Sequence, residues 1–216
     1  MSPRFRTPAP CLLLAAMALV MAFVMGTAAF AQHPGGPPKG QWVHPPTKLP
    51  KVKRGDQTHD LDTLFEALKV APDDDSAKAI ENRIWAVMLV SKSDTANLLM
   101  NRVKSAIEAK DLDLAIKLLD GITEIKPDYI EAWNRRATIY YMKKDYGHAL
   151  IDIAHVLALE PRHFGALSGL GLIMQDIGDD KYALKAYRRA LAVHPHLQRI
   201  PDVVKTLTEK VEGRNI

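Results

Sequence analysis

The residues best able to do chemistry are two histidines and an aspartate in one stretch, His148, Asp152 and His155. Imidazole and carboxylate groups ligate metals and transfer protons, so these three are the first candidates for a catalytic or metal site. On a helix, however, a spacing of seven residues is about two turns and separates the two imidazoles by roughly 10 Å, too far to share one ion. We therefore expect these histidines to be solvated or to lie at the edge of a core. The same interpretation applies to His163, His194 and His196.

Other signatures of catalysis or cofactor binding do not occur in the sequence. There is no glycine-rich phosphate loop, no nucleophile elbow and no cysteine pair, since the only cysteine is Cys11. His33 and His44 stand beside prolines in a stretch with no regular pattern, which offers no coordination geometry. The sequence therefore predicts no enzyme activity of its own, no metal and no cofactor.

The elements that must position any site follow from a period of 34 residues, at which Pro127, Pro161 and Pro195 recur. The twelfth residue before each proline is alanine and the twenty-eighth is large and apolar: Ala115, Ala149 and Ala183, then Leu99, Trp133 and Leu167. Small residues let two antiparallel helices approach closely, and proline ends a helix. Each unit is therefore predicted to be a helix, a turn and a second helix, and an aspartate in each turn can cap that second helix: Asp111, Asp145 and Asp179.

This pattern resembles the tetratricopeptide repeat (TPR), whose unit has the same length. The matching residues are Leu99, Ala115, Leu119 and Pro127 in the first unit, Trp133, Ala137, Tyr140, Tyr146, Ala149 and Pro161 in the second, and Leu167, Leu170, Gly171, Gly178, Ala183, Tyr187, Ala190 and Pro195 in the third. The resemblance implies an all-α fold, a right-handed α-solenoid of stacked antiparallel helix pairs, with repeats at 96–129, 130–163 and 164–197. A degenerate helical hairpin or N-terminal cap is expected at 59–95, and a C-terminal capping helix at 200–213.

The resemblance also implies a binding surface, because the first helices of successive repeats line a groove in this family. By position within the matched repeats, the groove residues are Asn97, Met100, Asn101, Lys104, Glu131, Asn134, Arg135, Thr138, Tyr141, Ser168, Leu172 and Gln175. Such side chains can hydrogen-bond a peptide backbone or grip a carboxylate. The alternative is that they only solvate the surface.

Two arginines depart from the repeat pattern where leucine is usual, Arg102 and Arg136, one period apart. A guanidinium between helices must be paired or reach solvent along its stem, because burying it alone costs several kcal/mol. Candidate partners are Glu108, Glu131 and Asp152. We expect a structural ion pair, with a ligand site as the alternative.

The N-terminal region has another character. Residues 1–31 begin with two arginines, continue through an apolar run and end in AFA, which is typical of a bacterial secretory signal peptide. The run is also long enough to remain as an uncleaved anchor. Residues 32–58 are rich in proline, glycine and lysine, and we expect a disordered basic linker there.

These features predict an exported scaffold in the periplasm or outside the cell, one that binds a protein or peptide. The sequence holds 29 basic and 25 acidic residues with no basic face bearing stacking aromatics, so no nucleic-acid partner is expected. Contact with a membrane is expected only through an N-terminal segment retained in the inner membrane. Two alternatives stay open, a membrane-anchored assembly subunit that self-associates and an accessory subunit of an enzyme.

Overall fold

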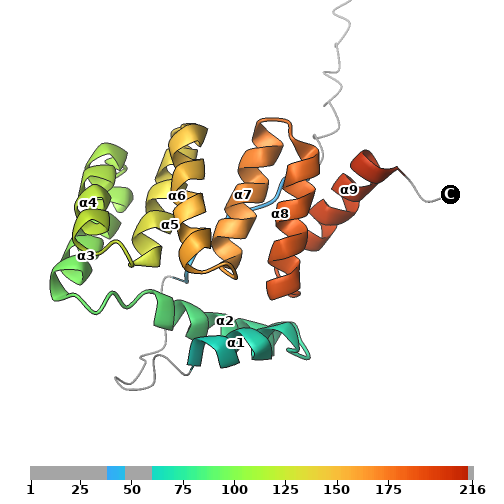
Figure 1. Ribbon diagram of the computed structural model, residues 1–216, viewed down its shortest axis with the longest axis horizontal. Coiled ribbons are helices and arrows are strands. Elements are labelled where there is room, and N and C mark those ends of the chain that lie inside the picture. The colour runs from blue at the N-terminus through green and yellow to red at the C-terminus, as the bar shows by residue number, and fades with distance from the viewer. Residues whose placement is uncertain (1–37, 47–59, 214–216) are drawn as a thin grey trace, which may run out of the picture. The chain divides into compact units, whose positions relative to one another are not determined.

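The computed structural model describes residues 38–46 and 60–213. The predicted signal segment 1–31 and most of the predicted linker 32–58 lie outside these residues. All regular secondary structure in the described part is α-helical, as the sequence predicted (Figure 1). Its helices are α1 (Asp60–Lys69), α2 (Asp74–Met88), α3 (Asp94–Glu108), α4 (Leu112–Ile125), α5 (Ile130–Met142), α6 (Tyr146–Leu159), α7 (Phe164–Asp176), α8 (Asp180–Val193) and α9 (Ile200–Glu212).

The second helix of each repeat begins after an aspartate whose carboxylate caps it. The carboxylates of Asp111, Asp145 and Asp179 accept hydrogen bonds of 3.0, 3.2 and 3.1 Å from backbone N–H groups three residues ahead. The residue before each aspartate has a left-handed backbone: Lys110, Lys144 and Gly178, with φ of 61°, 60° and 85°. This conformation ends the first helix of each pair, freely for glycine and at roughly 1 kcal/mol for lysine.

Three helix pairs, α3/α4, α5/α6 and α7/α8, stand side by side and form a helical solenoid (Figure 1). The alanines of the sequence period lie inside these pairs and are fully buried: Ala115, Ala149 and Ala183. A Cβ added at Gly171 of α7 would lie 2.5 Å from the Tyr187 ring of α8. The small residues thus bring each pair of helices into close contact, which is the role that the sequence predicted for them.

The hairpin α1–α2 packs on the C-terminal repeat and not on the N-terminal end of the stack, where we expected it (Figure 1). Its Trp85 is fully buried, with ring centroids 5.0 Å from Phe164 and 5.5 Å from His163. Arg162 lies over the Phe65 ring at 4.4 Å. The apolar face of the hairpin was evident in the sequence, but its partner surface depends on where these aromatic rings fit.

The last helix, α9, packs on α8. It buries Ile200, Val203 and Leu207 and exposes most of its remaining side chains, so it provides a polar outer surface beside the last repeat. Among the described residues, none of the helices combines the length and apolar character needed to traverse a bilayer.

Candidate peptide-binding groove

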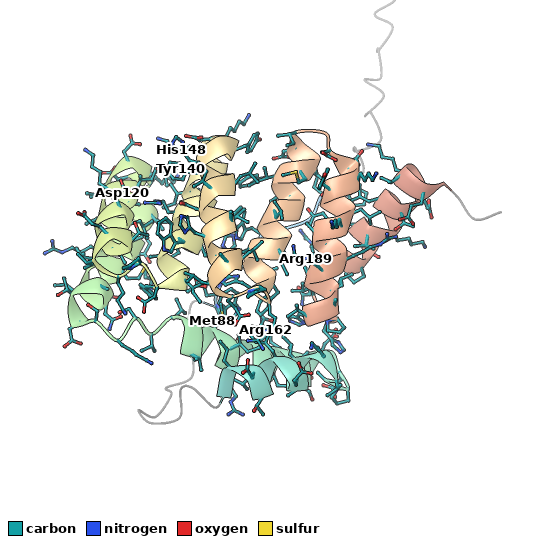
Figure 2. All side chains as sticks on the ribbon, in the orientation of Figure 1. Met88, Asp120, Tyr140, His148, Arg162 and Arg189 are labelled. Atoms are coloured by element: carbon teal, nitrogen blue, oxygen red, sulfur yellow. The ribbon has the colours of Figure 1, made fainter. Side chains whose placement is uncertain are left out.

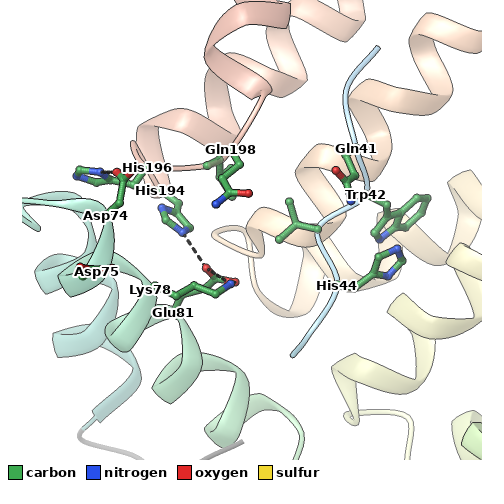
Figure 3. A pocket seen from close by; sticks show the side chains of 12 residues that line it. Gln41, Trp42, His44, Asp74, Asp75, Lys78, Glu81, His194, His196 and Gln198 are labelled. Carbon is green, nitrogen blue, oxygen red and sulfur yellow. Dashed lines mark hydrogen bonds and ion pairs between the residues drawn. The ribbon is translucent and has the colours of Figure 1, made fainter. Parts of the chain in front are cut away.

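Residues 38–46, with the sequence PKGQWVHPP, have no regular secondary structure and lie against α7; we call them the strap (Figure 3, blue). The sequence predicted a disordered linker here, and for the strap this prediction is wrong. Trp42 is the reason: its side chain is 3% exposed. Burying an indole removes of order 200 Å² of surface from water, which opposes the entropy lost on ordering the segment.

Polar contacts hold the first part of the strap at the C-terminal end of α7. Lys39 Nζ pairs with Asp176 Oδ1 at 2.7 Å, and Gly40 N–H donates to Gln175 Oε1 at 3.1 Å. Tyr187 Oη also donates to Gln175 Oε1, at 2.8 Å, which fixes the amide. Burial raises the pKa of Asp176, but hydrogen bonds from Lys39 and the tyrosines beside it outweigh burial and hold the pKa below its ordinary value of 3.8. Asp176 is therefore negatively charged at neutral pH where it faces the strap.

Apolar contacts hold the centre of the strap. Trp42 belongs to the same buried cluster as Leu172 and Ile173, and its ring centroid lies 5.6 Å from that of Tyr141. The α7 backbone beneath it is bare, because a Cβ added at Gly169 would lie 2.6 Å from the indole. We call this surface the strap site, and it consists of Tyr141, Gly165, Gly169, Leu172, Gln175, Asp176 and Tyr187.

The last part of the strap borders a cavity of about 370 Å³ shared with α2 and the turn after α8 (Figure 3). Inside it, His194 Nε2 lies 3.4 Å from Glu81 Oε2, and both side chains are buried. Burial lowers the pKa of His44, the Arg135 guanidinium lowers it further and Glu131 opposes both. The His44 side chain remains exposed to solvent, so these neighbours favour its neutral form in the docked strap without fixing it.

A second cavity of about 370 Å³ lies between α3 and α5 and is not covered by the strap; we call it the open site. Its lining residues are Leu89, Val90, Asn97, Met100, Asn101, Lys104, Tyr129 and Arg135. Five of these are groove residues that the resemblance implied, Asn97, Met100, Asn101, Lys104 and Arg135. Arg135 Nε is buried and has no hydrogen-bond partner among the described residues. None of the described lining residues is acidic, so Lys104 and Arg135 give the lining a positive charge, with Glu108 outside it 3.9 Å from Lys104.

The other implied groove residues divide into two sets. Tyr141, Leu172 and Gln175 contact the strap. Four are taken up by internal contacts or buried: Glu131, Asn134, Thr138 and Ser168. Glu131 is fully buried and bonds His163 Nε2 at 2.7 Å. His163 Nδ1 accepts from the Ala166 N–H, so the proton lies on Nε2 and the histidine donates to Glu131.

The two atypical arginines have different surroundings. Arg136 forms a two-bond pair with Asp152 through Nε at 2.8 Å and Nη2 at 2.7 Å, and a third bond with Asp120 at 2.7 Å. It also lies over Trp133, 4.8 Å from the ring centroid. The predicted ion pair of Arg136 is present. Asp152 was one of the expected partners, whereas Asp120 was not. Arg102 is exposed, so its predicted place between helices is wrong.

The histidines first considered for chemistry stack on aromatic rings of α5. His155 stacks on Trp133, with ring centroids 4.2 Å apart. His148 stacks on Tyr140, with ring centroids 4.9 Å apart, and both are labelled in Figure 2. His148 also contacts the Asp145 carboxylate at 2.7 Å. Among residues 38–46 and 60–213, no group of three or more histidine, cysteine, aspartate or glutamate side chains is arranged to hold a metal ion.

Sequence reasoning missed the strap and its floor. The available signals were the pair Trp42-Val43 within a proline-rich stretch and the two glycines Gly165 and Gly169, four residues apart on one face of a helix. A tryptophan has no evident use in a solvated linker, and glycine weakens a helix. Neither signal alone identifies the other as its partner.

Comparison with known proteins agrees with the helical repeat. No protein-family model matches the sequence. A TPR repeat-containing protein of Rhizobium etli is 44% identical over 153 residues, which are 71% of this chain and 75% of the relative. The small glutamine-rich tetratricopeptide repeat-containing protein 2 of Saccharomyces cerevisiae is 27% identical over 137 residues, covering 62% of this chain and 39% of that protein.

Solved structures share the fold. A MamA protein superposes with a TM-score of 0.51 at 19% identity, covering 74% of this chain and 85% of its own. The Sgt2 TPR domain of Aspergillus fumigatus gives 0.50 at 23% identity, over 56% and 81% of the two proteins. With the 34-residue period, the capped helix pairs and a relative of such identity and coverage, the chain belongs to the tetratricopeptide repeat family.

Proposed function

We propose that this protein is an exported, non-catalytic scaffold of the cell envelope that binds an anionic segment of a partner protein in the open site. TPR proteins mediate protein–protein interaction, and the open site is where this chain offers unused binding groups. The main support is the buried Nε of Arg135, which has no hydrogen-bond partner in the described part of the chain and lies beside a cavity whose described lining holds no acidic residue.

The chemistry of the open site favours a carboxylate. Arg135 and Lys104 supply positive charge, and the amides of Asn97 and Asn101 supply donors at the same cavity. Lys104 is only weakly engaged elsewhere, because its Nζ lies 3.9 Å from the exposed Glu108 carboxylate. Leu89 and Met100 add apolar surface for the neighbouring side chain of the partner. An aspartate, a glutamate or a free carboxyl terminus fits this combination.

Export is supported by the sequence of residues 1–31, where two arginines precede an apolar run and a small-residue motif. A scaffold on the far side of the membrane meets partners in the envelope, and the non-catalytic part of the proposal agrees with the lack of catalytic motifs in the sequence.

A photo-crosslinking amino acid at Asn101, in intact cells, tests this function. Crosslinks to a partner protein are expected from position 101 and not from Leu114, which is exposed on the second helix of the same repeat. Arg135→Gln should abolish them, and the matched control Arg102→Gln, which removes an exposed arginine outside the cavity, should not. Equal crosslinking at both positions, or none lost in Arg135→Gln, contradicts the proposal.

A further inference from the structure

We infer that the strap site is a receptor for an extended segment of the pattern Lys-Gly-x-Trp, and that the protein's own strap fills it as a built-in ligand. The inference concerns the other part of the groove and rests on the proposed peptide-binding function. The strap site thus selects partner segments by this sequence pattern, and the strap regulates binding, because a partner segment enters only when the strap leaves.

The glycine of the pattern is required by the receptor. A Cβ on Gly40 would lie 2.0 Å from the Tyr187 hydroxyl and 2.4 Å from the ring carbon that bears it. Tyr187 cannot move aside, because its side chain is fully buried and its hydroxyl is bonded to Gln175. Any other residue at this place in the ligand is therefore excluded.

The receptor is shaped for the tryptophan in the same way. At Gly169, the three nearest atoms to an added Cβ all belong to the Trp42 indole, at 2.6–2.7 Å. One turn earlier, a Cβ at Gly165 would meet the Val43 carbonyl oxygen at 2.8 Å and Trp85 at 3.0 Å. Glycine in a helix interior is unfavourable relative to alanine. Glycine at position 169 leaves the space that the docked Trp42 indole occupies.

The lysine sets the direction of the segment. Lys39 reaches Asp176 at the C-terminal end of α7, while Val43 and His44 lie toward its N-terminal end. The lysine side chain is 65% exposed, so this pair adds little affinity. The specificity comes from matched shapes, with a glycine on each side of the interface facing an aromatic ring on the other.

Occupation by the same chain follows from the length of the connection. Thirteen residues, 47–59, join the strap to α1, and a link of this length spans at most about 45 Å. Such a link corresponds to an effective concentration on the order of millimolar. A free segment must compete with that concentration, so the strap keeps the site closed to weak ligands.

The test is binding of a fluorescein-labelled peptide of residues 38–46 to the full-length protein. Trp42→Ala empties the strap site and should bind the peptide at least tenfold more tightly than the wild type. Gly40→Ala, which keeps the indole, is a second way to expel the strap and should act alike. A peptide with alanine in place of Gly40 should not bind any of these proteins.

The receptor side is tested in the Trp42→Ala background. Adding Gly169→Ala should abolish peptide binding, while the control Gly121→Ala should not, because an added Cβ on α4 meets nothing within 4 Å. Equal binding to wild type and Trp42→Ala overturns occupation by the strap. Peptide binding that survives Gly169→Ala would show that the peptide does not bind over Gly169 and would overturn the proposed site. A wild-type dimer that Trp42→Ala dissociates would show that the strap of a second copy, and not the protein's own strap, fills the site. This experiment does not use the anionic partner, so its outcome does not depend on whether the open site binds an anionic segment.

Discussion

The strap site, mainly on α7, and the open site, between α3 and α5, each include a residue of α5 but recognise ligands in different ways. The strap site has an apolar centre floored by glycine backbone and a polar end at Gln175 and Asp176, and a segment of the same protein fills it. The open site is polar, cationic and has an arginine nitrogen without a partner among the described residues. Shape decides what binds the first and charge decides what binds the second, so one short surface can distinguish two classes of ligand.

The largest expected effect comes from removing Trp85, which packs against α7 beneath the strap site and does not line the open site. Trp85→Ala deletes a fully buried indole packed on Phe164 and His163, and we expect a loss of about 3–5 kcal/mol in the free energy of unfolding. Urea denaturation measures it. Trp133→Ala, which removes a partly exposed ring stacked on His155, is the comparison and should lose less. Equal losses would mean that α1–α2 does not support α7.

Arg136 and Arg102, one period apart, test whether the ion pair between α5 and α6 stabilises α5, the helix that contributes residues to both sites. Arg136→Leu leaves the buried Asp152 without its guanidinium, so we expect a loss of about 3 kcal/mol and weaker binding at both sites. Arg102→Leu changes an exposed residue and should alter stability by less than about 0.5 kcal/mol. Thermal and urea unfolding of the pair provide the measurement. Unchanged stability in Arg136→Leu contradicts the structural role.

Gly169→Ala should change the strap and the solenoid in opposite directions. The added methyl group collides with Trp42 and expels the strap, whereas alanine strengthens α7 by about 1 kcal/mol. Trypsin cleavage after Lys39 should become faster, and the unfolding midpoint should rise less than in Gly121→Ala, because the docked strap no longer stabilises the fold. Gly121→Ala should raise the unfolding midpoint and leave the rate of cleavage after Lys39 unchanged. Slow cleavage after Lys39 in Gly169→Ala would show that Trp42 does not sit on this glycine.

The period predicted the helix pairs and their caps because each depends on nearby residues. Asp145, for example, caps the helix that begins at the next residue. The strap could not be predicted, since its order depends on Gly169, 127 positions after Trp42 along the sequence. The resemblance placed Glu131 in the groove by position, but its burial follows from His163 in the next turn between repeats. Arg102 and Arg136 have equivalent positions, yet only Arg136 has an aspartate facing it from the next helix.

Acidification is a milder way to separate the two sites. His44 faces Arg135 and Glu131 of α5 and shares its cavity with Lys78, Glu81 and His194. Because docking lowers its pKa from 6.5, the docked strap binds fewer protons than the released strap. Docking is then most favourable above pH 6.5 and weakens as the pH falls below that value toward the lowered pKa, a small effect because the His44 side chain is exposed. Trypsin cleavage after Lys39 should rise from pH 7.5 to 5.5, corrected for the protease's own pH dependence, and His44→Gln should flatten the change. An unaltered rise in His44→Gln would assign it to another group.

The most direct test of the division into a filled and an open site is the exposure of Trp42 in solution. Fluorine NMR of the full-length protein labelled with 5-fluorotryptophan, with Trp42→Phe for assignment, follows the three indoles separately. We predict that a soluble paramagnetic agent leaves the Trp42 signal as sharp as that of the buried Trp85, and that Gly169→Ala exposes Trp42 alone. A Trp42 signal broadened in the wild type as strongly as in Gly169→Ala would contradict the account.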